Sequence, residues 1–240
     1  MGAAPALHAR LLACGAMPYP FAHPVAVLPL APALGRLAVP SALVIGSMVP
    51  DAWYLFPGLA RADSHGASGL VFFCLPLGLL AYLLFQLLVR EPLCALLPRA
   101  IASRIPFAPD TPPWAAVCIS VLAGAITHIG WDLVAHSVEY RGVNVLQHAS
   151  TAFGTLVLAW WCARWLSRAP VTAARRKTAP AAWRAGFGLV LAACAWWVIA
   201  QALASGAEDL RLSLRMAAAE GLRVLGAGLI VYCAAWKLRA

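Results

Sequence analysis

The stretch SGLVFFCLPLGLLAYLLFQLLV, from Ser68 to Val89, decides the fold class. It holds no charged residue, and at about 1.5 Å per helical residue it is long enough to cross the roughly 30 Å hydrocarbon core of a bilayer. The stretch from Ala185 to Ala207 has the same character. Backbone amides cannot stay unpaired in lipid, and neither stretch alternates polar and apolar residues. Both therefore predict transmembrane helices rather than strands of a barrel.

Three further apolar segments extend this prediction. Trp114 to Val138 is interrupted by Asp132 and two histidines, Gly142 to Ala163 begins with polar residues, and Gly221 to Trp236 carries Arg223. Each is still long enough, or nearly so, to cross a bilayer as a helix. We therefore predict an all-α, polytopic membrane helix bundle with about five transmembrane helices.

The N-terminal region differs because it is rich in proline: nine of the eighteen prolines fall within the first 57 residues. Its apolar runs, Val25 to Leu34 and Ser41 to Val49, would each cover only about half of a bilayer as a helix. A short apolar segment can enter the membrane only where protein buries its backbone. The sequence thus predicts a re-entrant helical hairpin that turns at Gly35-Arg36 and packs against the bundle.

Composition and charge support a membrane protein. Hydrophobic residues make up 62% of the 240 and charged residues 11%, and the mean hydropathy is +0.79, which excludes an ordinary soluble domain. Eighteen Lys and Arg against nine Asp and Glu give a net charge of +9. Four basic residues, Arg61, Arg141, Arg211 and Arg215, lie on one predicted side beside most of the loop acids. Eleven lie on the other side, namely Arg90, Arg99, Arg104, Arg164, Arg168, Arg175, Arg176, Lys177, Arg184, Lys237 and Arg239. By the positive-inside rule they mark the cytoplasmic side, so the basic excess needs no nucleic-acid partner.

The chain divides into three predicted regions. Residues 1–16 are expected to be a disordered extension ahead of a natural start at Met17. Residues 17–166 form the membrane domain with the polar residues described next, and residues 167–240 contribute a cytoplasmic basic loop and two further transmembrane helices. The seven cysteines are widely spaced with no CxxC pair, so we interpret them as small apolar side chains rather than disulfides or zinc ligands.

The segment THIGWDLVAH, Thr127 to His136, is the most informative polar motif. His128, Asp132 and His136 follow one another at intervals of four, so a helix places them on one face. An imidazole and a carboxylate one turn apart can bind a single Zn²⁺ or similar ion. Alternatively, the pair could only form a hydrogen bond between helices. Counted from Trp114, both residues fall in the outer half of the membrane.

The predicted topology gathers further polar residues at the same outer end, namely His23, Asp51, His65 and His148. Each has a simpler alternative. His65 could help to start the following helix, His148 could be a solvated residue in a first turn, His23 could precede a helix that begins at the next proline, and Asp51 could cap a helix. A carboxylate within such an apolar sequence is nevertheless costly unless a cation lies nearby.

Five motifs carry a resemblance to a known family: FAHPVAVLPL (21–30), SALVIGSMVPD (41–51), DSHGASGLVFFCLPLGLL (63–80), THIGWDLVAH (127–136) and LQHAST (146–151). Through them the sequence from about Met17 to Leu166 resembles a bacterial integral-membrane family, the domain of unknown function 4184. That family is similar to predicted membrane-bound metal-dependent hydrolases. The order of its His and Asp residues is also similar to that of zinc-dependent phospholipase C and single-strand nucleases.

The resemblance implies a role for each polar residue. His65, His128 and Asp132 would hold one metal ion, and His23 would share Asp132 as a bridge to another. Asp51 would be the catalytic base that orients the attacking water.

The resemblance also implies that His136 and His148 hold a further ion. The zinc enzymes place a Glu one helical turn after the last histidine, whereas this chain has Ala152 there. A free N-terminus, which is a ligand in those enzymes, has no counterpart here.

These interpretations predict a divalent-metal-dependent hydrolase that binds one or two ions of zinc. Its substrate would be a phosphoester of a membrane lipid or lipid-linked compound at the outer leaflet of the bacterial plasma membrane. The alternative is a non-catalytic membrane protein whose His/Asp cluster binds ions or fixes helix packing. A metal site requires the side-chain atoms of His65, His128 and Asp132 to lie within about 4 to 5 Å of one another. No nucleic-acid partner is expected, since the basic loops lack interleaved aromatic residues.

Overall fold

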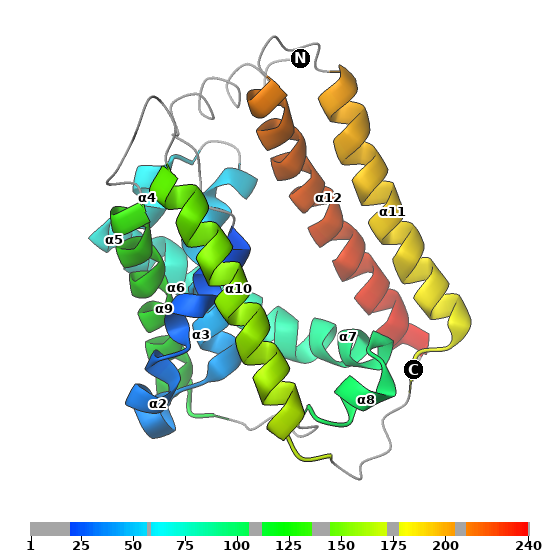
Figure 1. Ribbon diagram of the computed structural model, residues 1–240, viewed down its shortest axis with the longest axis horizontal. Helices are drawn as coiled ribbons and strands as arrows, with labels where there is room; N and C mark the ends of the chain where they lie inside the picture. The colour runs from blue at the N-terminus through cyan, green and yellow to red at the C-terminus, as the bar shows by residue number, and fades with distance from the viewer. Residues whose placement is uncertain are drawn as a thin grey trace. The chain divides into compact units, whose positions relative to one another are not determined.

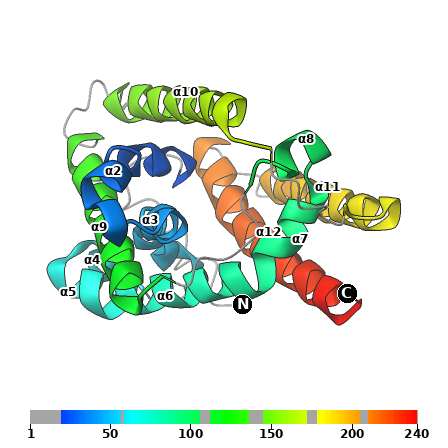
Figure 2. The same cartoon turned by 90° about the horizontal axis from the view of Figure 1, so that it is seen from below.

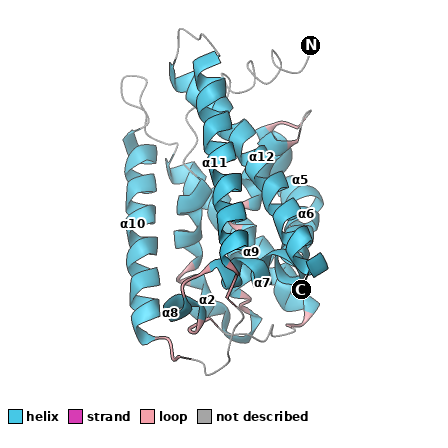
Figure 3. Cartoon of the chain, turned by 90° about the vertical axis from the view of Figure 1, so that its right-hand side faces the viewer, coloured by secondary structure: helices cyan, strands magenta, loops and turns pink. Residues whose placement is uncertain are grey.

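The computed structural model describes residues 20–56, 59–105, 112–135, 145–171, 178–204 and 210–239. Within these ranges all regular structure is helical (Figure 3). The all-α prediction is therefore confirmed. The predicted extension at residues 1–16, and His136 with it, lies outside the described residues.

Four helices in the described ranges are long and apolar enough to cross a membrane: Ala67–Leu96, Trp114–Val134, Ala181–Gln201 and Glu220–Arg239. They coincide with four of the five predicted segments. The other segment forms α10 (Val145–Arg168), which is 24 residues long but richer in Trp, Arg and polar side chains. The polytopic bundle is confirmed, and the count of five stays a prediction.

The stretch quoted first is one long helix with two turns of wider, π-type winding. It is composed of α5 (Ala67–Gly69), η4 (Leu70–Cys74), α6 (Leu75–Leu84), η5 (Phe85–Val89) and α7 (Arg90–Leu96). Only 17% of its most apolar stretch of 18 residues is buried within the protein. Large apolar side chains such as Phe72, which is 82% exposed, therefore face outward, as expected for a helix in contact with lipid.

The proline-rich N-terminal region consists of short helical pieces on either side of one turn. They are η1 (Pro20–Val27), α2 (Leu30–Leu34), η2 (Gly35–Leu37), α3 (Pro40–Gly46) and η3 (Val49–Leu55). Gly35 adopts a φ of 54°, a backbone conformation that glycine enters without steric cost. The predicted helical hairpin and its re-entry into the membrane stay predictions.

A buried serine on α9 (Trp114–Ala135) forms hydrogen bonds to the backbone of the proline-rich N-terminal region. The Val39 backbone N–H donates a hydrogen bond to Ser120 Oγ at 2.9 Å, and Ser120 Oγ donates one to the Leu37 carbonyl at 3.0 Å. The turn between η2 and α3 has few helical hydrogen bonds of its own. Ser120 therefore satisfies backbone groups that would otherwise be unpaired inside the protein.

Helices α3 and α9 pack side by side, with their backbones touching (Figure 2). A Cβ atom at Gly124 would lie 2.3 Å from the Leu43 carbonyl oxygen and 2.7 Å from the Ser47 nitrogen. At Gly46 it would lie 2.2 Å from the Val121 carbonyl oxygen. Small residues at a helix crossing allow this close approach, which is a common packing mode for helices in membranes. One consequence is that Ser47 comes within reach of α9.

Buried apolar side chains fill the space beside this crossing. Those packed between α3, α6 and α9 are Val39, Ala42, Tyr82, Ala116, Val117 and Val121. A second buried cluster consists of Val49, Cys74 and Ala125. Val49 lies two residues before Asp51, Ala125 lies three residues before His128, and Cys74 lies on the neighbouring η4. Of the six described cysteines, Cys74, Cys194 and Cys233 are buried, as expected of small apolar side chains, whereas Cys162 is exposed.

The chain separates into two compact units, and the polar residues of interest all belong to the unit of Ala16–Leu83 and Ala108–Ala169. The other unit includes α8 (Arg99–Ala102) and the antiparallel pair α11 (Ala181–Ala204) and α12 (Leu210–Arg239), which lie side by side (Figure 1).

The charged residue expected inside the last span is compensated locally. Arg223 Nη1 donates a hydrogen bond to Glu220 Oε1 at 2.5 Å, one helical turn away. The Lys237 ammonium pairs with the Glu91 carboxylate within the same unit. Because an ionisable side chain in a span is costly unless it is paired, these contacts are consistent with the transmembrane assignment of α12. The predicted domain boundary at residue 166 stays a prediction.

Candidate metal centre

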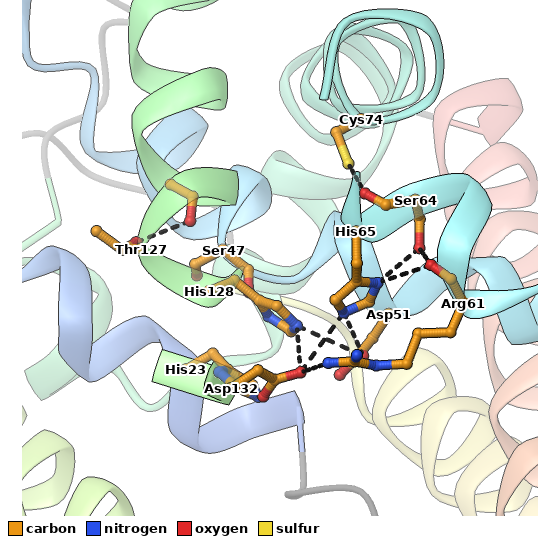
Figure 4. A network of polar contacts seen from close by, with 11 residues as sticks. His23, Ser47, Asp51, Arg61, Ser64, His65, Cys74, Thr127, His128 and Asp132 are labelled. Carbon is orange, nitrogen blue, oxygen red and sulfur yellow. Dashed lines mark hydrogen bonds and ion pairs between the residues drawn. The ribbon is translucent and has the colours of Figure 1, made fainter. Parts of the chain in front are cut away.

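Four residues from three separate elements converge in the interior of the first unit (Figure 4). Asp51 comes from η3, His65 from α4 (Arg61–His65), and His128 and Asp132 from successive turns of α9. One ligand atom from each lies within 4.8 Å of the ligand atoms of the others. Asp51, His128 and Asp132 are buried and His65 is largely so. The distance expected for a metal site is therefore met, and Asp51 joins the group of possible ligands.

The individual separations are suited to an ion rather than to direct hydrogen bonds. His128 Nε2 lies 3.5 Å from Asp51 Oδ1 and 3.6 Å from Asp132 Oδ2. His65 Nε2 lies 3.5 Å from Asp132 Oδ2 and 3.9 Å from Asp51 Oδ1. A hydrogen bond between a charged N–H and a carboxylate is shorter, about 2.7–2.9 Å. Tetrahedral bonds of roughly 2.0–2.1 Å to His and Asp instead place ligand atoms about 3.3–3.4 Å apart.

The orientation of His128 is fixed by the close helix crossing. Its Nδ1 lies 2.7 Å from the Ser47 carbonyl oxygen. Because a carbonyl oxygen only accepts hydrogen bonds, Nδ1 carries the proton and donates it. This leaves Nε2 facing the two carboxylates. A metal-binding histidine is typically held in this way, with its second ring nitrogen donating to a carbonyl or carboxylate.

His65 is held in a similar way at the end of α4. Its Nδ1 lies 2.8 Å from Ser64 Oγ and 3.2 Å from the Arg61 carbonyl oxygen, and Ser64 Oγ donates to that same carbonyl. Asp63 Oδ2 accepts a hydrogen bond from the Ala60 N–H at 2.6 Å and so stabilises the start of the helix. This contact belongs to α4 itself, so the alternative in which His65 helps to start the following helix stays a prediction. His65 itself directs Nε2 toward Asp51 and Asp132.

His23, on η1, lies beside His128 and Asp132. Its ring stacks on His128 with centroids 3.9 Å apart, and its Nε2 lies 3.7 Å from Asp132 Oδ1, the oxygen that does not face His65. Burial lowers the pKa of His23 to about 4, so the ring is neutral near pH 7, which is the form that binds metals. Neither ring nitrogen has a hydrogen-bond partner in the part of the chain that the structure describes. The predicted sharing of Asp132 between His23 and the other histidines is therefore geometrically feasible.

One member of the cluster was not anticipated from the sequence. Arg61 is not among the predicted site residues, but its Nη2 donates a hydrogen bond to Asp132 Oδ2 at 2.5 Å. Its position four residues before His65 was the available signal, since that spacing places both residues on one face of a helix. Arg61 brings one positive charge to two buried carboxylates. With neutral imidazoles the cluster keeps a net charge of −1, which a metal ion or a proton on an imidazole must balance.

The remaining predicted ligands do not join this group. His148 lies in the first turn of α10 with an exposed side chain, so the structure does not bring it to the four ligands. His136 lies outside the described residues. The further metal ion predicted at these two histidines therefore stays a prediction.

The family comparison fits this distribution of residues. Residues 17–144 match the family described as "Domain of unknown function (DUF4184)". The chain belongs to the DUF4184 family. His23, Asp51, Arg61, His65, His128 and Asp132 all lie within the range matched to DUF4184, whereas His148 falls outside it. No curated protein and no solved structure matches the chain, so the chemistry of this DUF4184 protein has to be argued from the site itself.

Proposed function

We propose that this protein is a membrane-bound, divalent-metal-dependent hydrolase that acts on a phosphoester of a lipid or lipid-linked compound. The observation that carries the proposal is a pair of separations, 3.5 and 3.6 Å, between Asp132 Oδ2 and the Nε2 atoms of His65 and His128. These are too long for hydrogen bonds and suit ligands of one ion. A mixed His/Asp set suits zinc, which is the metal we propose.

His65, His128 and Asp132 would hold the ion, and Asp51 would act as the base. A bound Zn²⁺ supplies a water of pKa about 7 and neutralises charge on a phosphoryl group. Asp51 Oδ1 lies at ligand distance from His128, so its carboxylate is placed to accept a proton from that water. His23 would support Asp132 through its second oxygen.

A lipid substrate follows from the position of the cluster along α9. His128 and Asp132 lie near the C-terminal end of a span that runs from Trp114 to Val134. Such a site is close to one membrane surface, where the headgroup of a lipid would reach it. The positive-inside rule assigns this end to the extracytoplasmic side of the bacterial plasma membrane.

The test is metal analysis of the protein purified in detergent, followed by assays with a panel of phosphoesters. Wild type should contain about one zinc ion per chain as purified, or bind one when zinc is added and retain it on gel filtration. His128→Ala and Asp132→Ala should both lose the ion and any hydrolytic activity. His148→Ala is the control, because an exposed histidine on α10 should not affect this ion. Equal, trace metal in all four proteins would refute the proposal.

A second candidate is a non-catalytic protein in which the cluster binds an ion or fixes helix packing. The ion pair between Arg61 and the buried Asp132 favours it, since such a pair can be structural without any metal. Tight metal binding without hydrolysis of any phosphoester would favour the ion-binding form. Full stability without metal would favour the packing form.

A further inference from the structure

We propose that Arg61 binds the phosphate group of the ligand, a role that rests on the proposed function of the site. Arg61 is not among the predicted site residues. Three of its properties support this role: its exposure, the free hydrogen-bond donors of its guanidinium and the positive charge that it adds to the cluster.

Arg61 lies at the boundary between the cluster and its surroundings. Its side chain is 36% exposed, whereas the side chains of Asp132 and His65 are 3% and 7% exposed. A ligand that reaches the buried carboxylates and imidazoles would therefore meet the guanidinium (Figure 4). The backbone of Arg61 is held in place, because its carbonyl oxygen accepts hydrogen bonds from Ser64 and His65. This ties the guanidinium to one of the proposed metal ligands.

The Arg61 guanidinium has N–H donors that are available to a ligand. Within the described residues, its hydrogen bond is the one from Nη2 to Asp132 Oδ2. A guanidinium carries five N–H donors in a planar fork that suits two oxygens of a phosphate group. Asp132 is able to accept from Arg61 and to bind a metal at the same time, because ligating carboxylates are commonly hydrogen-bonded as well. Arg61 would thus hold a phosphate next to the ion without leaving Asp132.

The charge of the loaded site selects an anion. Two carboxylates, neutral imidazoles, Arg61 and a divalent ion together give a net charge of +1. Without Arg61 the same site would be neutral. A site with an excess positive charge and low exposure attracts an anionic group more strongly than an exposed arginine does, because water screens it less. A phosphate group has enough oxygens to bind the ion and the planar fork at the same time.

The test measures phosphate binding directly, so it does not depend on catalysis. Zinc-loaded wild type, Arg61→Gln and Arg61→Lys are compared by equilibrium dialysis with labelled inorganic phosphate. A second arm uses dihexanoyl phosphatidic acid to distinguish free phosphate from a lipid headgroup. Arg36→Gln is the matched control, since Arg36 is an exposed arginine at the predicted hairpin turn. Arg61→Lys retains a charge beside Asp132 and serves if the glutamine variant does not fold.

We expect all variants to hold the same amount of zinc. Arg61→Gln should bind phosphate about 10- to 100-fold more weakly, and Arg61→Lys should fall between it and wild type. Phosphate binding that is absent in wild type, or unchanged in Arg61→Gln, would overturn the inference and leave the metal site intact. Loss of zinc from both Arg61 variants would also overturn it, because Arg61 would then only position Asp132. Absence of zinc from wild type would refute the proposed function, and the inference with it.

Discussion

Replacing Gly124 by alanine would test how helix packing positions the metal ligands. The added Cβ would lie 2.3 Å from the Leu43 carbonyl oxygen, whereas ordinary contacts begin at 3.4 Å. Because the atoms that the Cβ would meet belong to the backbone of Leu43, Gly46 and Ser47, α3 has to move away from α9 by about 1 Å. The hydrogen bond of 2.7 Å between His128 Nδ1 and the Ser47 carbonyl would then exceed its effective range.

The expected result is a weaker metal site in a folded protein. Loss of a partner that orients a metal-binding histidine typically lowers metal affinity by about 10- to 100-fold, or about 1.4–2.7 kcal/mol. The affinity is measured by competition with a chromophoric zinc chelator in detergent. Circular dichroism reports helix content and thermal stability for the same samples.

Two other glycine substitutions separate the effect on the site from the effect on packing. A Cβ at Gly130, on the same helix, meets nothing within 4 Å, so Gly130→Ala should retain wild-type affinity. A Cβ at Gly78 would lie 2.4 Å from Val121 Cγ1, a packing clash with α9 that involves neither Ser47 nor His128. Gly78→Ala should therefore lower thermal stability with little change in affinity. Wild-type affinity in Gly124→Ala, or an equal loss in Gly130→Ala, would refute the reasoning.

Three further predictions address other parts of the protein. Asp51→Asn should retain the ion and lose most activity if Asp51 is the base, whereas loss of the ion measured by metal analysis would make it a ligand. Ser120→Ala removes the partner of the buried Val39 N–H and of the part-buried Leu37 carbonyl, and it should cost about 1–3 kcal/mol in thermal unfolding. Thr155→Ala removes an exposed hydroxyl that bonds within α10 and should cost little. The C-terminal basic residues are predicted to be cytoplasmic. A green fluorescent protein fused after Arg239 should therefore fluoresce, and an alkaline phosphatase fused there should be inactive. The opposite pattern would show that the predicted topology is inverted.

The pairing of His128 with Asp132 was predictable because it is local. Two residues four apart share a helix face in any sufficiently long helix, and the apolar sequence from Trp114 onward makes that helix necessary in a membrane. The addition of His65 and Asp51 was a weaker prediction. It depended on a topology inferred from charge, which places residues at one end of a bundle but does not specify their distances.

Arg61 shows where charge patterns are insufficient. The positive-inside rule treats an arginine near a helix end as a marker of topology. Its contact with Asp132 depends on how the short helix α4 packs against η3 and η4 and so comes within reach of α9, which is distant in the sequence. His148 shows the converse, since a histidine at the expected end of the bundle has an exposed side chain on α10.

The sequence by itself determined the helical class and four spans, because the length and apolarity of a segment are sufficient to require a helix in lipid. It also determined the shared face of His128 and Asp132. Only the tertiary structure decided which distant side chains complete the cluster and how their rings are oriented. The physical reason is that these contacts depend on a helix crossing at Gly46 and Gly124 that is close enough for the Ser47 carbonyl to reach His128, and sub-ångström packing of this kind is not encoded in residue spacing.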